Sequence, residues 1–451
     1  MLRTLIKNGR IVTMDKSLGQ LSGGDILIEG DKIIAISQNI EAHGAEIIDA
    51  SEMIVLPGFI NGHLHTWQTN LRGLAADWSV SEYMRAMHRG LATLFRPEDI
   101  YIGNLMGALN QLNNGVTTLV DWCHNNPTPQ HTDAAVKGLQ DAGIRALFLH
   151  GSPKPDPGPG QRHFSEVPMP RGEIERLRKT SFSSDKSLLT LGLAILGPYY
   201  STYEVTQTDL TLAKEFDILA SMHVGGGTGK VPQGFERLLG DGMVDEHLTI
   251  VHGNDIAAGT VKRIADLGGT FTVTAEIELQ MGYGDPLTGL LNSIGAPISI
   301  GSDVEPAVGS DMFTCMRMTL QHERHREISN VLARTNARPA QSTITCRDAL
   351  KWITTSAAEI AGLGDRVGSL TVGKQADIVM LRASDLNMTP ACDLIGCVVM
   401  QGSVANVDTV LVAGEVLKRH GKLLFPGLNK KISEARNSSE RIVGEFERLT
   451  S

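Results

Sequence analysis

Two hydrophobic patterns divide the 451-residue chain. Near each end, over residues 1–57 and 366–425, short segments alternate apolar and polar residues between turn residues. This alternation is typical of antiparallel strands, so we expect one small β-sandwich domain formed from both chain ends. The last segment, residues 426–451, has apolar residues at helical spacing and predicts a C-terminal helix that packs on the domain or on a neighbouring subunit. Its predicted apolar face consists of Ile432, Ala435, Ile442, Val443, Phe446 and Leu449.

The middle of the chain, residues 58–365, alternates apolar strands with segments of helical periodicity. Strands that are apolar on both faces and separated by helices are typical of a parallel sheet covered on both sides. Eight such units predict an α/β fold whose catalytic domain is a closed (β/α)8 TIM barrel. The expected strands are residues 59–65, 117–122, 145–151, 188–196, 218–224, 248–253, 270–276 and 297–303.

Composition and charge narrow the range of partners and locations. The chain has 41 Lys+Arg against 50 Asp+Glu and no basic block, so nucleic acid and anionic membranes are poor partners. No apolar run approaches the roughly 20 residues of a membrane-spanning helix, and the N-terminus lacks the apolar core of a signal peptide. We therefore expect a cytoplasmic protein that acts on a small molecule. Because soluble proteins commonly form symmetric assemblies, we also expect a homo-oligomer, either a dimer or a tetramer.

Metal-ligating side chains stand at the carboxyl ends of four predicted barrel strands, which is where TIM barrels place their reacting groups. The first strand ends with His63 and His65, and a spacing of two places both imidazoles on one side of an extended strand. Three other strands end at His223, His252 and Asp303. Imidazole and carboxylate ligands that leave one position open are typical of catalytic zinc sites. The pattern predicts one divalent metal ion, Zn²⁺ in the first place, with Fe²⁺ as the alternative because ligand type discriminates weakly.

Three further motifs carry a family resemblance, namely LPGFINGHLHTWQTNLRGL, NNGVTTLVDW and VGSLTVGKQADIVML. Together with the strand-end residues, they resemble the amidohydrolase superfamily, and within it the branch of cytosine-deaminase-like and triazine-hydrolase-like enzymes. The resemblance covers nearly the whole chain. It is specific for the superfamily and much less specific for the substrate.

The resemblance implies a role for each strand-end residue. His63, His65, His223 and Asp303 would bind a single metal, and His252 would lie beside the activated water or the polarised atom of the substrate. A divalent metal lowers the pKa of bound water towards about 7, which provides hydroxide to attack an sp² carbon. Asp303 would take the proton as general base, and His252 would stabilise the developing charge.

One departure from the family pattern concerns proton transfer. Deaminases that this chain resembles carry a glutamate three residues after the strand-five histidine, and this chain has Gly226 there. We expect Glu276, which closes the predicted seventh strand, to replace it as a catalytic proton carrier or to anchor a cationic or NH-bearing substrate. A salt bridge or a turn cap is the structural alternative for Glu276. Glu278 and Glu305 are weaker candidates.

Aromatic and imidazole groups in the first two loops after barrel strands predict contacts with the substrate. Trp67 and Trp122 could stack on a flat heterocycle, although packing in the core is the alternative for an indole. His124 could donate a hydrogen bond to the substrate or stabilise its loop. The proline-rich loop at residues 151–171 predicts a semi-rigid lid or an oligomer contact.

The predicted function is that of a metal-dependent hydrolase. Metal-bound hydroxide would cleave a C–N bond, other than a peptide bond, in a small nitrogen-containing heterocycle and release ammonia. One alternative keeps the same site and opens a cyclic amide or displaces a halide or a substituted amine. More distant alternatives are a lyase and a non-catalytic binding protein.

Overall fold

The computed structural model describes residues 3–225 and 229–450. It contains one parallel sheet, as expected from the apolar strands, and one mixed sheet where the alternation predicted antiparallel strands. The chain forms two compact units: one holds the mixed sheet, and the other holds most of the parallel sheet and all the side chains of the candidate site. The predicted α/β class, with a TIM barrel and a small β-domain, is confirmed.

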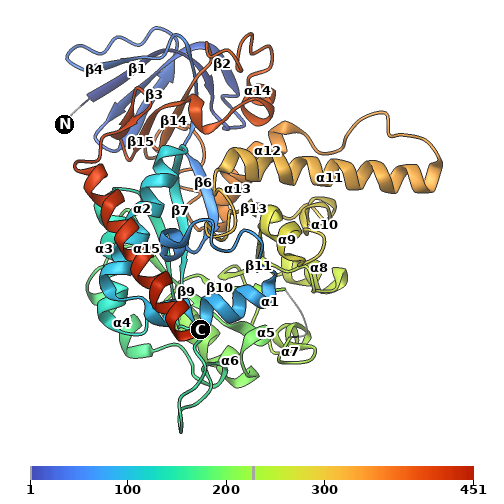
Figure 1. Ribbon diagram of the computed structural model, residues 1–451. Helices are drawn as coiled ribbons and strands as arrows, with labels where there is room; N and C mark the ends of the chain where they lie inside the picture. The colour runs from blue at the N-terminus through green and yellow to red at the C-terminus, as the bar shows by residue number, and fades with distance from the viewer. Residues whose placement is uncertain (1–2, 226–228, 451) are drawn as a thin grey trace. The chain divides into compact units, whose positions relative to one another are not determined.

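The mixed sheet joins the two ends of the chain. Strands close to the N-terminus and strands close to the C-terminus lie side by side in it (Figure 1). The connection between them is the antiparallel pairing of β5 with β14. Apolar residues from both ends pack in one buried core that includes Ile6, Ile26, Val55, Ile378 and Leu411. The strands are β1 (Arg3–Val12), β2 (Gln20–Glu29), β3 (Lys32–Ser37), β4 (Glu46–Asp49), β5 (Met53–Pro57), β14 (Ile378–Arg382), β15 (Val407–Val412), β16 (Glu415–Arg419) and β17 (Lys422–Leu423).

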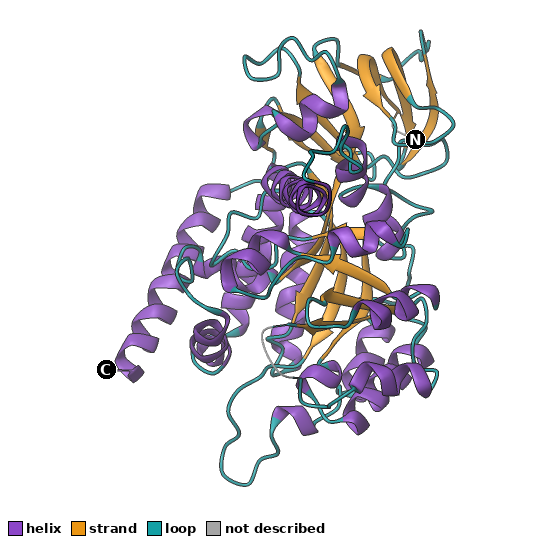
Figure 2. Ribbon diagram, turned by 90° about the vertical axis from the view of Figure 1, so that its right-hand side faces the viewer, coloured by secondary structure: helices purple, strands orange, loops and turns teal. Residues whose placement is uncertain are grey.

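The parallel sheet has eight strands that follow one another in sequence order. Figure 2 shows these strands with helices outside them. The first and last strands meet through a bridge between Leu64 and Asp303, which closes the barrel. The strands are β6 (Phe59–Leu64), β7 (Val116–Cys123), β8 (Arg145–Gly151), β9 (Leu189–Ile195), β10 (Ala220–Val224), β11 (Leu248–His252), β12 (Thr270–Val273) and β13 (Ile298–Ile300).

The helices alternate with the barrel strands and also flank the mixed sheet. The 3-10 and π segments are η1 (Thr66–Leu71), η2 (Met84–His88), η3 (Leu91–Leu94), η4 (Phe164–Glu166) and η5 (Val404–Asn406). The α-helices are α1 (Val80–Tyr83), α2 (Pro97–Asn113), α3 (Pro129–Ala142), α4 (Arg171–Lys179), α5 (Gly197–Tyr200), α6 (Tyr203–Glu215), α7 (Gly234–Gly240), α8 (Ala258–Asp266), α9 (Ala275–Met281), α10 (Thr288–Ser293), α11 (Met312–Thr335), α12 (Cys346–Trp352), α13 (Thr355–Ile360), α14 (Leu394–Met400) and α15 (Leu428–Thr450).

Strand β12 is shorter than the sequence predicts. It ends at Val273, whereas the apolar alternation continues to residue 276. The reason is that α9 begins at Ala275, and the carboxylate of Glu278 accepts a hydrogen bond of 2.8 Å from the Thr274 N–H in front of the helix. A side chain that reaches back in this way satisfies a backbone donor at the helix start. Glu276 therefore lies in the first turn of a helix and does not close a strand.

The predicted C-terminal helix is present as α15, but its apolar face is only partly buried. Ile442 is buried, whereas Ile432 and Leu449 are 39% and 74% exposed. A polar contact fixes the helix as well, because the Ser438 hydroxyl donates a hydrogen bond of 2.6 Å to the buried carboxylate of Asp99. The helix is present where the apolar spacing places it, and packing of its exposed apolar residues on a neighbouring subunit stays a prediction.

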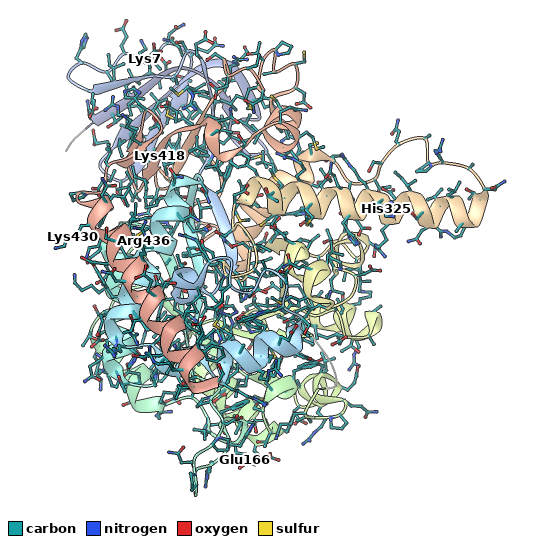
Figure 3. All side chains as sticks on the ribbon, in the orientation of Figure 1. Lys7, Glu166, His325, Lys418, Lys430 and Arg436 are labelled. Carbon is teal, nitrogen blue, oxygen red and sulfur yellow. The ribbon has the colours of Figure 1, made fainter. Side chains whose placement is uncertain are left out.

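None of the helices in the described part of the chain combines the length and the apolar composition required to cross a membrane. The two longest helices, α11 and α15, carry exposed polar side chains (Figure 3). Examples are His325 on α11 and Lys430 and Arg436 on α15.

Candidate metal centre and active site

Four side chains converge at the carboxyl end of the parallel barrel. His63 lies in β6, His65 follows that strand, His223 lies in β10, and Asp303 follows β13. One ligand atom from each of these residues lies within 4.8 Å of the others. The Nε2 atoms of His63 and His65 lie 3.1 and 3.3 Å from Asp303 Oδ1. The Nε2 atoms of His63 and His223 are 3.1 Å apart. The structure therefore brings together the four metal ligands predicted from the sequence.

The backbone around Asp303 is shaped to present its carboxylate to the histidines. Asp303 has a φ of 64°, in the left-handed region that side chains other than Asn and Asp rarely adopt. Two hydrogen bonds hold this conformation: the Asp303 N–H donates to His63 O (3.0 Å), and the His65 N–H donates to Asp303 O (2.8 Å). The same two bonds close the barrel. Closure of the barrel and assembly of the ligand set are therefore one structural event.

Gly301 allows β13 to approach His63 closely. A Cβ atom at Gly301 would lie 2.6 Å from the backbone N and O of His63, and backbone atoms cannot move aside cheaply. We expect Gly301→Ala to displace His63 and to weaken metal binding by about tenfold or more, as when a residue that positions a metal ligand is lost. Metal content after dialysis against a weak chelator measures this effect. Gly172→Ala, at an exposed position with open space for a Cβ, is the control, and equal metal retention by both variants would contradict the expectation.

The chemistry of the four side chains suits a divalent cation. Burial lowers the pKa of His65 to about 3, and burial together with neighbouring imidazoles lowers the pKa of His223. Burial acts to raise the pKa of Asp303, but the hydrogen bond with His63 and the nearby imidazoles outweigh it and lower that pKa. Neutral imidazoles and an ionised carboxylate are the forms that bind metals. The Trp122 carbonyl lies 2.8 Å from His65 Nδ1, so it can accept a hydrogen bond from an N–H at Nδ1, which leaves the Nε2 lone pair directed at the other ligands.

His252 lies beside this ligand set and is held from behind by Glu278. The Nε2 atom of His252 is 3.7 Å from Asp303 Oδ2, and its Nδ1 atom is 3.2 Å from Glu278 Oε1. Burial acts to lower the pKa of His252, but the hydrogen bond with Glu278 and the charge of Asp303 outweigh it and raise that pKa. Glu278 is fully buried and also accepts the Thr274 N–H, so its carboxylate is fixed in place. The arrangement directs the Nε2 atom of His252 at the ligand set.

The other acidic candidates lie elsewhere. Glu276 is partly exposed, and it is not among the described residues that line the cavity at the ligand set. Its role as proton carrier stays a prediction. Glu305 is buried and forms an ion pair of 2.7 Å with Arg72, which is a structural role. Gly226, where the family glutamate would stand, lies outside the described residues.

A small cavity adjoins the ligand set, and a larger hollow lies next to this cavity. The cavity volume is about 20 Å³, which is room for about one water molecule. Its lining residues are His65, Tyr83, Met84, His88, His124, Lys154, Tyr200, His223, His252, Met281, Tyr283, Asp303 and Val304. The outer hollow has a volume of about 410 Å³ and shares Met84 and Tyr200 with the cavity wall. The hollow is large enough for a small substrate, and those two side chains separate it from the ligand set.

The predicted substrate-contacting residues divide into two groups. His124 lines the cavity, as the sequence predicts. Trp67 and Trp122 are buried behind the histidines: Trp67 Nε1 lies 3.4 Å from His124 Nδ1, and Trp122 Nε1 donates a hydrogen bond of 3.1 Å to Ser221 Oγ. Neither indole is among the described residues that line the cavity, so both support the site from behind.

Several lining residues could not be found by inspecting motifs. His88 lies in η2, Lys154 follows β8, and Tyr83, Tyr200 and Tyr283 lie at helix ends or in loops. The one feature of the sequence that pointed to any of these residues is the proline-rich loop at residues 151–171, which predicts a lid or an oligomer contact. This loop contains Lys154.

Comparisons with known proteins agree with this geometry. The sequence pattern of the amidohydrolase family matches residues 54–417. The chain belongs to the amidohydrolase family. A 5-methylthioadenosine/S-adenosylhomocysteine deaminase from Caldicellulosiruptor saccharolyticus is 28% identical to this amidohydrolase over 98% of the chain and 99% of the relative.

Two solved structures share the fold of this amidohydrolase. One is an atrazine chlorohydrolase from Arthrobacter aurescens TC1 complexed with zinc, with 20% identity, a TM-score of 0.84, and coverage of 97% of this chain and 100% of that one. The other is an adenosine deaminase from Xanthomonas campestris with bound zinc, with 20% identity, a TM-score of 0.81, and coverage of 98% and 99%. The predicted family, fold and enzyme class, a hydrolase of C–N bonds other than peptide bonds, are thereby confirmed.

Proposed function

We propose that this amidohydrolase removes an amino group hydrolytically from a small nitrogen-containing heterocycle and releases ammonia. The observation that carries the proposal is the convergence of His63, His65, His223 and Asp303 within 4.8 Å, with His252 beside them. The names of its deaminase relatives, which match along nearly their whole length, support deamination as the reaction. These four residues would hold one divalent cation, which activates water as a nucleophile at neutral pH when bound.

The residues of the chain would move the proton and stabilise charge. Asp303 is ionised and faces the ligand set, so it can accept a proton from the attacking water and return it to the leaving nitrogen. Water thus supplies OH to the carbon and H to the departing amine. His252, directed by Glu278, can donate a hydrogen bond to the ring atom on which negative charge develops.

Zinc is the metal that we propose, because three imidazoles and one carboxylate form a typical catalytic zinc donor set. Elemental analysis of protein purified without added metal tests this, and iron at full occupancy would replace zinc in the proposal. We also propose a cytoplasmic homo-oligomer, either a dimer or a tetramer, which light scattering on the purified protein tests through the particle mass.

An ammonia-release screen tests the reaction itself. Metal-loaded protein is incubated with amino-substituted purines, pterins and triazines, and with cyclic ureas as substrates for ring opening. Ammonia from at least one aminoheterocycle, lost on chelation and restored by metal, supports the proposal. Turnover without ammonia would contradict it and would favour the second candidate, ring opening of a cyclic amide or displacement of a halide or a substituted amine. That candidate is favoured by Gly226, since a better leaving group needs no glutamate to protonate it.

Glu278→Gln tests how His252 is positioned. Glutamine keeps the size of the side chain and removes the charge that holds His252 Nδ1, so we expect kcat to fall by about tenfold to a hundredfold. Metal content and KM should stay close to those of the wild type, because Glu278 touches neither the ligand atoms nor the cavity. Glu276→Gln is the matched comparison. If Glu276→Gln alone impairs turnover, Glu276 is the proton carrier and Glu278 serves only to cap α9.

A further inference from the structure

The ammonium group of Lys154 is buried in the cavity wall, and no described carboxylate lies within ion-pair distance of it, although the charge of Asp303 on the same cavity acts to raise its pKa. Lys154 is 5% exposed, and its Nζ lies 5.5 Å from the ring centroid of Trp122 and 5.0 Å from that of Tyr200. Within residues 3–225 and 229–450, Lys154 forms no hydrogen bond and no ion pair. Burial lowers its pKa to about 8, so the group still carries charge at neutral pH. Aromatic faces compensate a buried cation only in part, and an unpaired buried charge is costly.

The backbone holds Lys154 in this place. The residue lies three positions after β8, between Pro153 and Pro155. A proline on each side restricts the backbone, so little backbone conformational entropy is lost when this segment is fixed in the wall. The lysine is therefore presented to the cavity by a stiff segment.

The surroundings of Lys154 supply donors and no second carboxylate. Among the described lining residues of the cavity, Asp303 is the one acidic residue, and it already faces three imidazoles. His88 and His124 also line the cavity, and His124 Nε2 lies 3.3 Å from His88 Nδ1, so one ring can donate to the other and the pair can offer its remaining N–H to a ligand. The cavity wall beside the ligand set thus combines a cation with a hydrogen-bond donor. Such a surface complements negative charge.

The outer hollow continues the same pattern. Its described lining includes Arg85, Arg89 and Lys230 and no acidic residue, although the whole chain has a formal charge of −9. Arg89 also contacts Asp156 at 3.3 Å in an exposed pair, which leaves Arg85 and Lys230 to set the sign of the potential. A cleft lined by one sign of charge concentrates ligands of the opposite sign.

We propose that the substrate is an anionic heterocycle, one that bears a carboxylate or a comparably acidic group, and that this group pairs with Lys154 Nζ. Pairing with Lys154 would hold the ring across the cavity and turn its reacting carbon towards His63, His65, His223 and Asp303. Met84 and Tyr200 would move apart to admit it from the outer hollow. This inference rests on the proposed deaminase function and names the substrate class for that site.

Calorimetry on the metal-loaded protein tests the charge preference with two matched probes, orotate, which is a carboxylated pyrimidine, and uracil, which lacks the carboxylate. We expect the wild type to bind orotate at least about tenfold more tightly than uracil, because a desolvated ion pair discriminates strongly. Lys154→Met should abolish the difference, and Lys154→Arg should retain it. The control Lys179→Met, at an exposed position on α4, should change neither affinity. Equal affinities of the wild type for the two probes would overturn the inference.

Ammonia release provides the second arm of the test, with aminoheterocycles offered as neutral and carboxylated pairs such as cytosine and 5-carboxycytosine. The expected result is a kcat/KM for the carboxylated member that falls at least about tenfold in Lys154→Met, with little change for the neutral member. If only the neutral aminoheterocycles release ammonia, and Lys154→Met does not change that rate, the inference is overturned and the deaminase function stands. If orotate binding depends on Lys154 but no compound releases ammonia, the charge preference stands and the deaminase function is contradicted.

Discussion

The His65→Ala protein is expected to purify without its divalent metal and to show no hydrolytic activity. The His65 Nε2 atom lies 3.3 Å from Asp303 Oδ1 within a set of four ligand atoms, and alanine leaves three ligands around a wider opening. Activation of water by a metal contributes several kcal/mol to catalysis, and each 1.36 kcal/mol corresponds to a factor of ten. We therefore expect kcat/KM to fall by about a thousandfold or more. Elemental analysis and ammonia release measure the two losses.

A second buried histidine provides the control for His65→Ala. His150 lies near the end of β8 and hydrogen-bonds with Thr132, outside the ligand set. Loss of its imidazole should lower the melting temperature through packing and leave metal content intact. The melting temperature of His65→Ala should no longer rise when zinc is added, because a ligand stabilises only the state that binds it. Stoichiometric metal in His65→Ala would show that the ligand set is misassigned.

The barrel and the metal ligands could be predicted from the sequence because their signals are local. A parallel strand buried on both faces is a short, mostly apolar run, and a residue of metal-ligating type stands at or just after its end, as at His223 and Asp303. His63 and His65 share one strand end, so their proximity needs no knowledge of the fold. The one global fact required is that parallel strands present their carboxyl ends together, which the barrel supplies.

The remaining lining residues could not be predicted because their positions depend on long-range packing. Lys154 and His88 lie 66 positions apart, one in a loop and the other at the end of η2, and no local pattern shows that both reach the same cavity. Glu276 and Glu278 illustrate a different difficulty. Alternation favoured a strand through residue 276, but capping of α9 by Glu278 ended the strand early and turned Glu278, rather than Glu276, towards His252. A boundary error of three residues therefore decided which carboxylate was chosen.

The Asp303→Asn protein should keep its fold and bind metal more weakly, yet fail to turn over when metal is saturating. Asparagine tolerates the left-handed backbone at φ 64°, so both barrel-closing hydrogen bonds with His63 and His65 can form. The amide oxygen can still face the cation, but it lacks the negative charge and cannot accept the proton of the attacking water. We expect metal affinity to fall by about tenfold to a hundredfold. At saturating zinc we expect kcat to remain about a hundredfold or more below the wild-type value, because general base catalysis is lost.

Titration with zinc separates the two roles of Asp303, since a ligand defect is overcome by excess metal and a proton-transfer defect is not.

Asp209→Asn is the matched control. The Asp209 carboxyl is buried, which raises its pKa to about 7, and it accepts a hydrogen bond from the Met169 N–H outside the ligand set. It should leave both affinity and rate unchanged. Full recovery of kcat in Asp303→Asn at high zinc would mean that another group takes the proton. Glu278, the carboxylate beside His252, would then be the first candidate for that group. The impairment expected of Glu278→Gln would in that case reflect a loss of proton transfer and not a change in the position of His252.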